Sequence, residues 1–133
     1  MVERRRRLRV FRHIFRYRSF IKSFGYACTG ILYLFRYHQN MRLIFLMGIA
    51  AFLGGIFFRL NGNELAALCI TIMLVFMAEI INTAIELMLD MVTRKYHPMI
   101  KMVKDVAAGV VLLAVINAVG VGWILFGRKV FPH

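Results

Sequence analysis

This sequence contains few acidic residues, few cysteines and no recognisable leader. Only six of its 133 residues are Asp or Glu, against 18 Lys and Arg, so the formal net charge is +12. Cys28 and Cys69 lie in apolar surroundings without a C-x-x-C spacing, which favours buried thiols over a disulfide framework or a zinc site. The arginine-rich start is not followed by an apolar run ending in small residues, so we predict no signal peptide.

The hydrophobic content is 61%, above the roughly half that is usual in soluble domains. Disorder is excluded because it requires low hydrophobicity. The length allows a single domain, residues 1–133. A chain that is both basic and very apolar is typical of a membrane protein with a basic cytoplasmic face.

Three apolar stretches predict three transmembrane helices, over residues 43–58, 65–89 and 106–126. The first has 16 residues and would span about 24 Å, slightly short of the roughly 30 Å hydrocarbon core. Snorkelling of the flanking Arg42 and Arg59 can make up the difference. Recurring Gly and Ala residues in the first and third stretches favour close helix packing and self-association. The predicted fold is an all-α membrane bundle.

The first third of the chain carries too many charges to be a fourth span. We divide it into a basic tail, residues 1–9, and an amphipathic surface helix, residues 10–38. Its apolar residues recur at gaps of three and four, on one helix face: Val10, Ile14, Tyr17, Ile21, Phe24, Cys28, Ile31 and Phe35. This pattern is typical of a helix in the membrane interface. A basic anchor on anionic lipid is the alternative, and nucleic-acid binding is not expected beside three spans.

Loop charge predicts the orientation. Eleven of the 18 Lys and Arg lie in residues 1–42, and four more lie between the second and third spans. The positive-inside rule therefore places the N-terminus and that loop in the cytoplasm. The C-terminus, with Arg128 and Lys129, would lie outside.

A polar stripe interrupts the second span. Glu79 and Glu86 are seven residues apart, so they share a helix face about 10 Å apart. Asn82 lies between them and Asp90 follows at i+4. A carboxylate in lipid costs several kcal/mol, so such a stripe is by default a functional hypothesis. The alternative is that these charges neutralise one another and fix the helix register.

Lys104 and Asp105 stand at the mouth of the third span, level with Glu86 and Asp90. Carboxylates that hold Mg²⁺ and a lysine for phosphate charge are the parts that phosphoryl transfer needs. A deeper carboxylate, Glu79, could act as base on a hydroxyl at the lipid interface. The sequence has no Walker-type phosphate loop and no protein-kinase loop set.

The segment AEIINTAIE at residues 78–86, followed by Asp90, resembles the signature of the prokaryotic diacylglycerol kinase family, which includes undecaprenol kinases. The segments KYHP at 95–98 and VKDVAAG at 103–109 resemble further motifs of that family, in the right order and spacing. The resemblance covers roughly residues 20–127. The threonine that follows Asn82, Thr83, is more similar to the undecaprenol-type members than to the diacylglycerol-type ones.

The resemblance implies a homotrimer in the bacterial cytoplasmic (inner) membrane. Each subunit would have three spans and a surface helix, and would transfer the γ-phosphate of MgATP to a lipid hydroxyl, of undecaprenol or diacylglycerol. Glu79 would be the catalytic base and Glu86 would hold the metal. The expected nucleotide contacts are Tyr26, Glu86, Tyr96, His97, Lys104 and Asp105. Asn82, Asp90 and Arg42 would shape the site.

One position departs from the family pattern. Where relatives usually carry an acidic metal ligand before the first span, this chain has His38. Histidine suits zinc and other borderline metals better than Mg²⁺. The chain is therefore expected to use Mg²⁺ or another divalent metal, or to be a catalytically impaired relative that serves as a membrane scaffold. A proton or cation pathway along the polar stripe is a third hypothesis.

Overall fold

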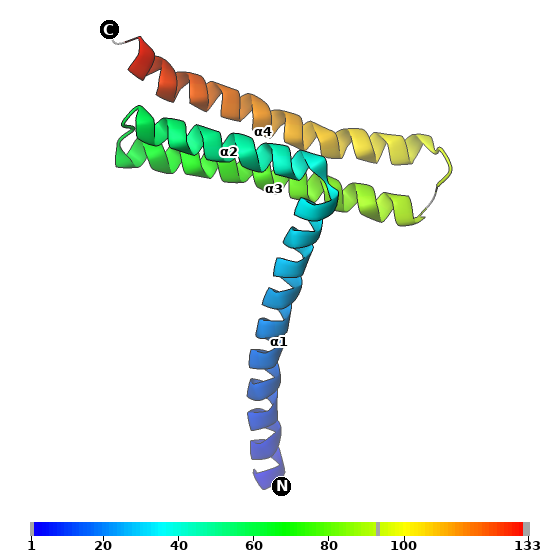
Figure 1. Ribbon diagram of the computed structural model, residues 1–133. Helices are drawn as coiled ribbons and strands as arrows, with labels where there is room; N and C mark the ends of the chain where they lie inside the picture. Colours follow the sequence, from blue (N-terminus) through cyan, green and yellow to red (C-terminus); the bar gives the residue numbers. More distant parts are fainter. Residues whose placement is uncertain (1, 93, 132–133) are drawn as a thin grey trace. The chain divides into compact units, whose positions relative to one another are not determined.

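The computed structural model describes residues 2–92 and 94–131, with side chains from residue 19 onward. These residues form four helices and no strand (Figure 1): α1 (Val2–Tyr37), α2 (Gln39–Phe57), α3 (Gly62–Val92) and α4 (Pro98–Val130). The last three are long and apolar enough to cross a membrane. The prediction of an all-α protein with three spans is therefore confirmed. The chain divides into two compact units, Met1–Gln39 and Asn40–His133.

The first unit is a single helix. α1 has 36 residues, about 54 Å at the usual rise, and it begins at Val2, within the stretch predicted as a tail. The predicted apolar face includes Val10, Ile14 and Tyr17. Their side chains are not among those that the structure describes. Farther along that face, Ile21 and other large apolar residues are exposed.

The second unit is a bundle of α2, α3 and α4, which run side by side in Figure 1. Glycines allow α2 to approach α3 closely. A Cβ atom added at Gly48 would lie 2.8 Å from Cγ2 of Ile72, and one added at Gly55 would lie 2.9 Å from Cδ2 of Leu68. Both distances are shorter than real Cβ contacts, so a side chain at either position would force Ile72 or Leu68 to shift.

The turn between α2 and α3 is built from two capping motifs. Arg59 adopts a left-handed conformation with φ 56°, while its N–H donates to Ile56 O and the N–H of Leu60 donates to Gly55 O. This is the hydrogen-bond pattern of a Schellman motif, with arginine where glycine is usual. Asn61 and Glu64 then form a reciprocal capping box, in which each backbone N–H donates to the other's side chain, at 3.0 and 2.9 Å.

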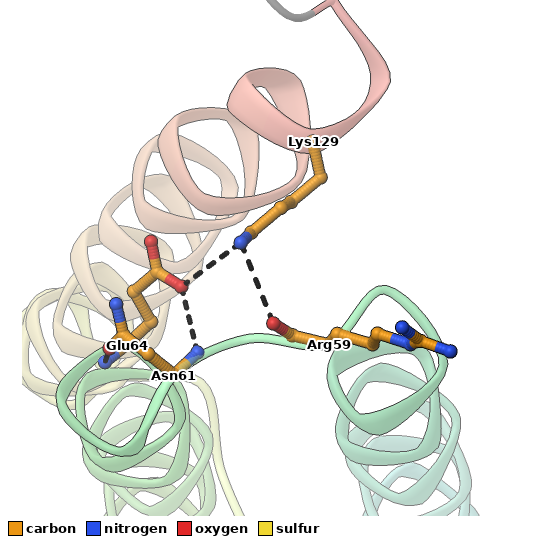
Figure 2. Close-up of polar contacts among 4 residues, drawn as sticks. All are labelled: Arg59, Asn61, Glu64 and Lys129. Atoms are coloured by element: carbon orange, nitrogen blue, oxygen red, sulfur yellow. Dashed lines mark hydrogen bonds and ion pairs between the residues drawn. The ribbon is translucent and has the colours of Figure 1, made fainter.

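Lys129 near the end of α4 ties that helix to the same turn (Figure 2). Its Nζ lies 3.8 Å from Oε2 of Glu64 and 3.5 Å from the carbonyl oxygen of Arg59. Phe126 adds an edge-to-face contact with Phe58, with ring centroids 5.7 Å apart. Two polar contacts and one aromatic contact therefore hold this end of the bundle together.

Neither cysteine is fully buried. Cys28 on α1 is exposed and Cys69 on α3 is half-buried. The prediction of buried thiols was wrong, because apolar neighbours mark a surface that avoids water, and lipid can cover such a surface in a membrane protein.

Candidate functional site

The polar stripe of α3 runs from the interior of the bundle to its surface. Glu79 and Asn82 are buried, with 6% and 9% of their surface exposed. Glu86, two turns from Glu79, is half-buried, and Asp90 is exposed. The stripe therefore connects a protected carboxylate with a water-accessible one on the same helix.

Asn82 carries an unused hydrogen-bond acceptor. Its Oδ1 is buried and has no partner among the described residues. Leaving such an atom unpaired costs about 1–3 kcal/mol. A group that donates a hydrogen bond to this atom, such as a hydroxyl, would remove that cost.

Asp90 joins α3 to α4 through Lys104. Lys104 Nζ donates to Asp90 Oδ1 at 2.8 Å. Lys104 precedes the charge-free run that begins at Val106, so it lies outside the predicted span. The hydrogen bond to Asp90, with the nearby charges of Asp90 and Glu86, raises the pKa of Lys104. Lys104 is therefore a fixed positive charge at the level of Glu86 and Asp90.

The first turn of α4 is set by His97 and Pro98. His97 is the N-cap, and its Nδ1 accepts a hydrogen bond from the backbone N–H of Met99 at 3.1 Å. Proline at the first helical position suits this start, since its fixed φ is helical and it has no N–H to satisfy. Nδ1 is occupied in the cap, so Nε2 is the nitrogen of His97 left to meet a ligand.

An open cleft of about 730 Å³ lies at the α3–α4 connection. All of its lining belongs to the bundle unit, and four of the lining side chains are cationic. The lining residues are Asp90, Arg94, Lys95, Tyr96, His97, Ile100, Lys101 and Lys104. Tyr96 is 80% exposed and so presents an aromatic ring to water. A cleft with this charge and an exposed ring is suited to a polyanion that carries an aromatic base.

The family assignment rests on the sequence match. The model of the prokaryotic diacylglycerol kinase family matches residues 25–126. The chain belongs to this family. The resemblance drawn from the three motifs is thereby confirmed.

Two curated relatives are similar to this chain over most of its length. A Synechocystis sp. protein named diacylglycerol kinase is 39% identical over 105 residues, which cover 78% of this chain and 60% of that protein. The undecaprenol kinase of Bacillus subtilis is 33% identical over 110 residues, covering 83% of this chain and 89% of the relative. The chain thus spans less than two thirds of the Synechocystis protein.

Most of the family-motif residues belong to the bundle unit. Tyr96, His97, Lys104 and Asp90 line the cleft. Glu79, Asn82 and Glu86 follow on the α3 stripe, and Asp105 lies one turn after Lys101 on α4. Arg42 is exposed in the first turns of α2.

The other two candidates belong to the first unit. Tyr26 is 74% exposed on α1. His38 is half-buried, and its ring centroid lies 6.1 Å from that of Tyr33. Among the described residues, no three His, Cys, Asp or Glu side chains gather as a metal site.

Sequence reasoning missed part of the cleft. Arg94 and Lys101 were used only as loop charges for orientation, and Lys95 only as a loop charge and a member of the KYHP motif, yet all three line it. For Lys101, the i,i+4 spacing to Asp105 could have indicated an ion pair on one face of the helix. In the structure, Lys101 Nζ lies 2.6 Å from Asp105 Oδ2.

Proposed function

We propose that this member of the family is an ATP-dependent lipid kinase. It transfers the γ-phosphate of ATP to the hydroxyl of a membrane lipid, undecaprenol or diacylglycerol, at the cytoplasmic interface. The observation that carries the proposal is the hydrogen bond between Lys104 and Asp90. It joins the basic cleft to the polar stripe, so a site for phosphates lies on the same helix as the buried carboxylate of Glu79.

The roles are those that the family resemblance implies, and the depth and charge of the residues support them. Tyr96, His97 and Lys104 bind the nucleotide in the cleft, with Asp105 beside them. Tyr26 on α1 stays a nucleotide contact predicted from the family resemblance alone. Glu79, deepest on the stripe, accepts the proton of the lipid hydroxyl. Asn82, one turn from Glu79 on the same helix, lines the surroundings of that hydroxyl, and its unpaired Oδ1 is open to a donor other than the proton that Glu79 takes. Arg42 and Asp90 shape the surroundings.

The donor set fits Mg²⁺ that is carried by the nucleotide. Mg²⁺ is usually held by one or two carboxylates together with substrate phosphates, and Glu86 supplies one half-buried carboxylate. When bound, the ion neutralises charge on the phosphates. His38 fits Mg²⁺ poorly, so the chain's own contribution to the metal is one carboxylate smaller than the family pattern.

We also propose that the chain is a multi-pass protein of the bacterial inner membrane, with a cytoplasmic N-terminus, and that it forms a homotrimer. Large apolar side chains are exposed on all three bundle helices, including Leu46, Leu74 and Leu112. Lipid or a second copy of the chain must cover these surfaces.

The test is ATP-dependent phosphorylation in detergent micelles, with undecaprenol and diacylglycerol offered side by side and with Mg²⁺, Mn²⁺ or Zn²⁺. Glu86→Gln should lower the rate at least about 100-fold, since it removes a charge needed at the transferred phosphate. Glu64→Gln is the matched control, because Glu64 caps α3 at the far end of the bundle. Full activity in Glu86→Gln would contradict the proposed role.

A second function rests on His38. If wild type is silent with every metal and lipid while His38→Glu is active, the chain is an impaired relative with a scaffold role. In that case the trimer should remain intact.

A further inference from the structure

The two acids beside the cleft are each paired with a lysine. Asp90 pairs with Lys104 at 2.8 Å, and Asp105 pairs with Lys101 at 2.6 Å. Lys104 and Asp105 lie in the VKDVAAG family motif, but Lys101 lies between the recognised motifs. The family motifs therefore assign no role to Lys101.

Lys101 occupies a boundary position. It lines the cleft at the α3–α4 connection together with Lys104. It also lines a neighbouring hollow of about 500 Å³ that includes Tyr96 and Asp105. The Lys101 ammonium therefore stands between the basic cleft and the Asp105 carboxylate.

The charge balance of this region depends on Lys101. Four cations line the cleft, and Asp90 and Asp105 are the acids paired with two of them. Removal of Lys101 takes away one cation and also leaves Asp105 without its partner. An uncompensated carboxylate next to a triphosphate is repulsive, and the surface exposure of the pair moderates this effect without abolishing it.

We propose that Lys101 is a positioning residue for the nucleotide, acting through Asp105. Its ammonium holds the Asp105 carboxylate by the Nζ–Oδ2 contact and cancels its charge, so that the triphosphate does not meet an uncompensated carboxylate beside the cleft. This inference rests on the proposed function, because it takes ATP to be the ligand of the cleft.

The experiment measures equilibrium binding of a non-hydrolysable ATP analogue to the full-length protein in detergent. Lys101→Met should raise the Kd about two- to five-fold, the range expected for loss of one exposed ion pair. The KM for ATP should rise in parallel while kcat changes less than about two-fold. Lys101→Arg should bind the analogue with the Kd of wild type, since arginine keeps the positive charge. Lys129→Met, at the other end of α4, is the matched control and should bind as wild type does.

A double-mutant cycle tests the route through Asp105. In an Asp105→Asn background, Lys101→Met should change the Kd by much less than it does in wild type. An undiminished effect would mean that Lys101 contacts the phosphates directly, and an unchanged Kd in the single variant would mean that it does nothing. Either result overturns the proposal.

Failure of the kinase assignment is recognisable separately. If wild type binds the analogue but phosphorylates no lipid, the lipid-kinase function fails while the cycle still decides the role of Lys101. If wild type phosphorylates lipid and Lys101→Met is indistinguishable from it, only the inference fails. Absence of nucleotide binding by wild type would overturn both.

Discussion

Lys104 of α4 and Asp90 of α3 are 14 residues apart in sequence and joined by a 2.8 Å hydrogen bond. The contact exists because a short connection folds α4 back along α3, which brings the two motifs to the same level. It couples the basic cleft to the helix that carries the buried carboxylate of Glu79.

We predict that Lys104→Met separates activity from stability. The pair is exposed, with 38% and 64% of the two side chains accessible, so its loss should change the free energy of unfolding by less than about 1 kcal/mol. Lipid phosphorylation should fall about 100-fold or more, since a charge directed at the phosphates is removed. Kinetics and thermal unfolding in detergent measure the two effects.

The comparison is with Lys129→Met, which removes an ion pair at the other end of α4. That variant should keep its activity. If Lys104→Met were fully active, the cleft would not be the phosphate site.

We predict that Asn82→Leu makes the protein more stable and inactive. The buried Oδ1 atom has no partner among the described residues, and replacing the amide by an apolar group of similar size removes that cost. The free energy of unfolding should rise by about 1 kcal/mol. ATP-dependent lipid phosphorylation should be lost, because an apolar side chain one turn from Glu79 replaces the polar amide beside the lipid hydroxyl.

Thr71→Val is a suitable control on the same helix, since the Thr71 hydroxyl already donates to the carbonyl oxygen of Ala67 at 2.8 Å. It should leave activity intact. A destabilised Asn82→Leu protein would indicate that the assembled protein already satisfies this amide.

We predict that Arg59→Gly stabilises the turn between α2 and α3. Arg59 has φ 56°, and a residue with a Cβ atom pays about 1 kcal/mol there that glycine does not. The gain should appear in thermal unfolding, with no change in the KM for ATP. Arg59→Ala removes the same charge but keeps the Cβ atom, so equal stabilities of the two variants would contradict the explanation.

The three spans were predictable because each is an apolar run bounded by charge, and the stripe was predictable because Glu79 and Glu86 interrupt such a run. The ends of the helices were not. α4 begins at Pro98, eight residues before the apolar run at Val106, since His97 and Pro98 start the helix. Hydropathy marks where lipid ends, whereas capping marks where a helix ends.

The detailed contacts of the site were less accessible to sequence reasoning. The pairing of Lys104 with Asp90 depends on how far α4 folds back, and the unused oxygen of Asn82 depends on which neighbours pack around it. Neither follows from spacing along one helix. The Lys101–Asp105 pair, by contrast, is local and could have been predicted.

The length of α3 has a consequence for where the two substrates meet. Its 31 residues extend about 46 Å, well beyond a hydrocarbon layer of roughly 30 Å. Glu79 and Asp90 are eleven residues apart on it, about 16 Å in depth. If the proposed function holds, a water-soluble phosphate donor can therefore stay in the headgroup region while the hydrocarbon chain of the lipid stays in the bilayer core, and α3 sets the depth at which each is bound.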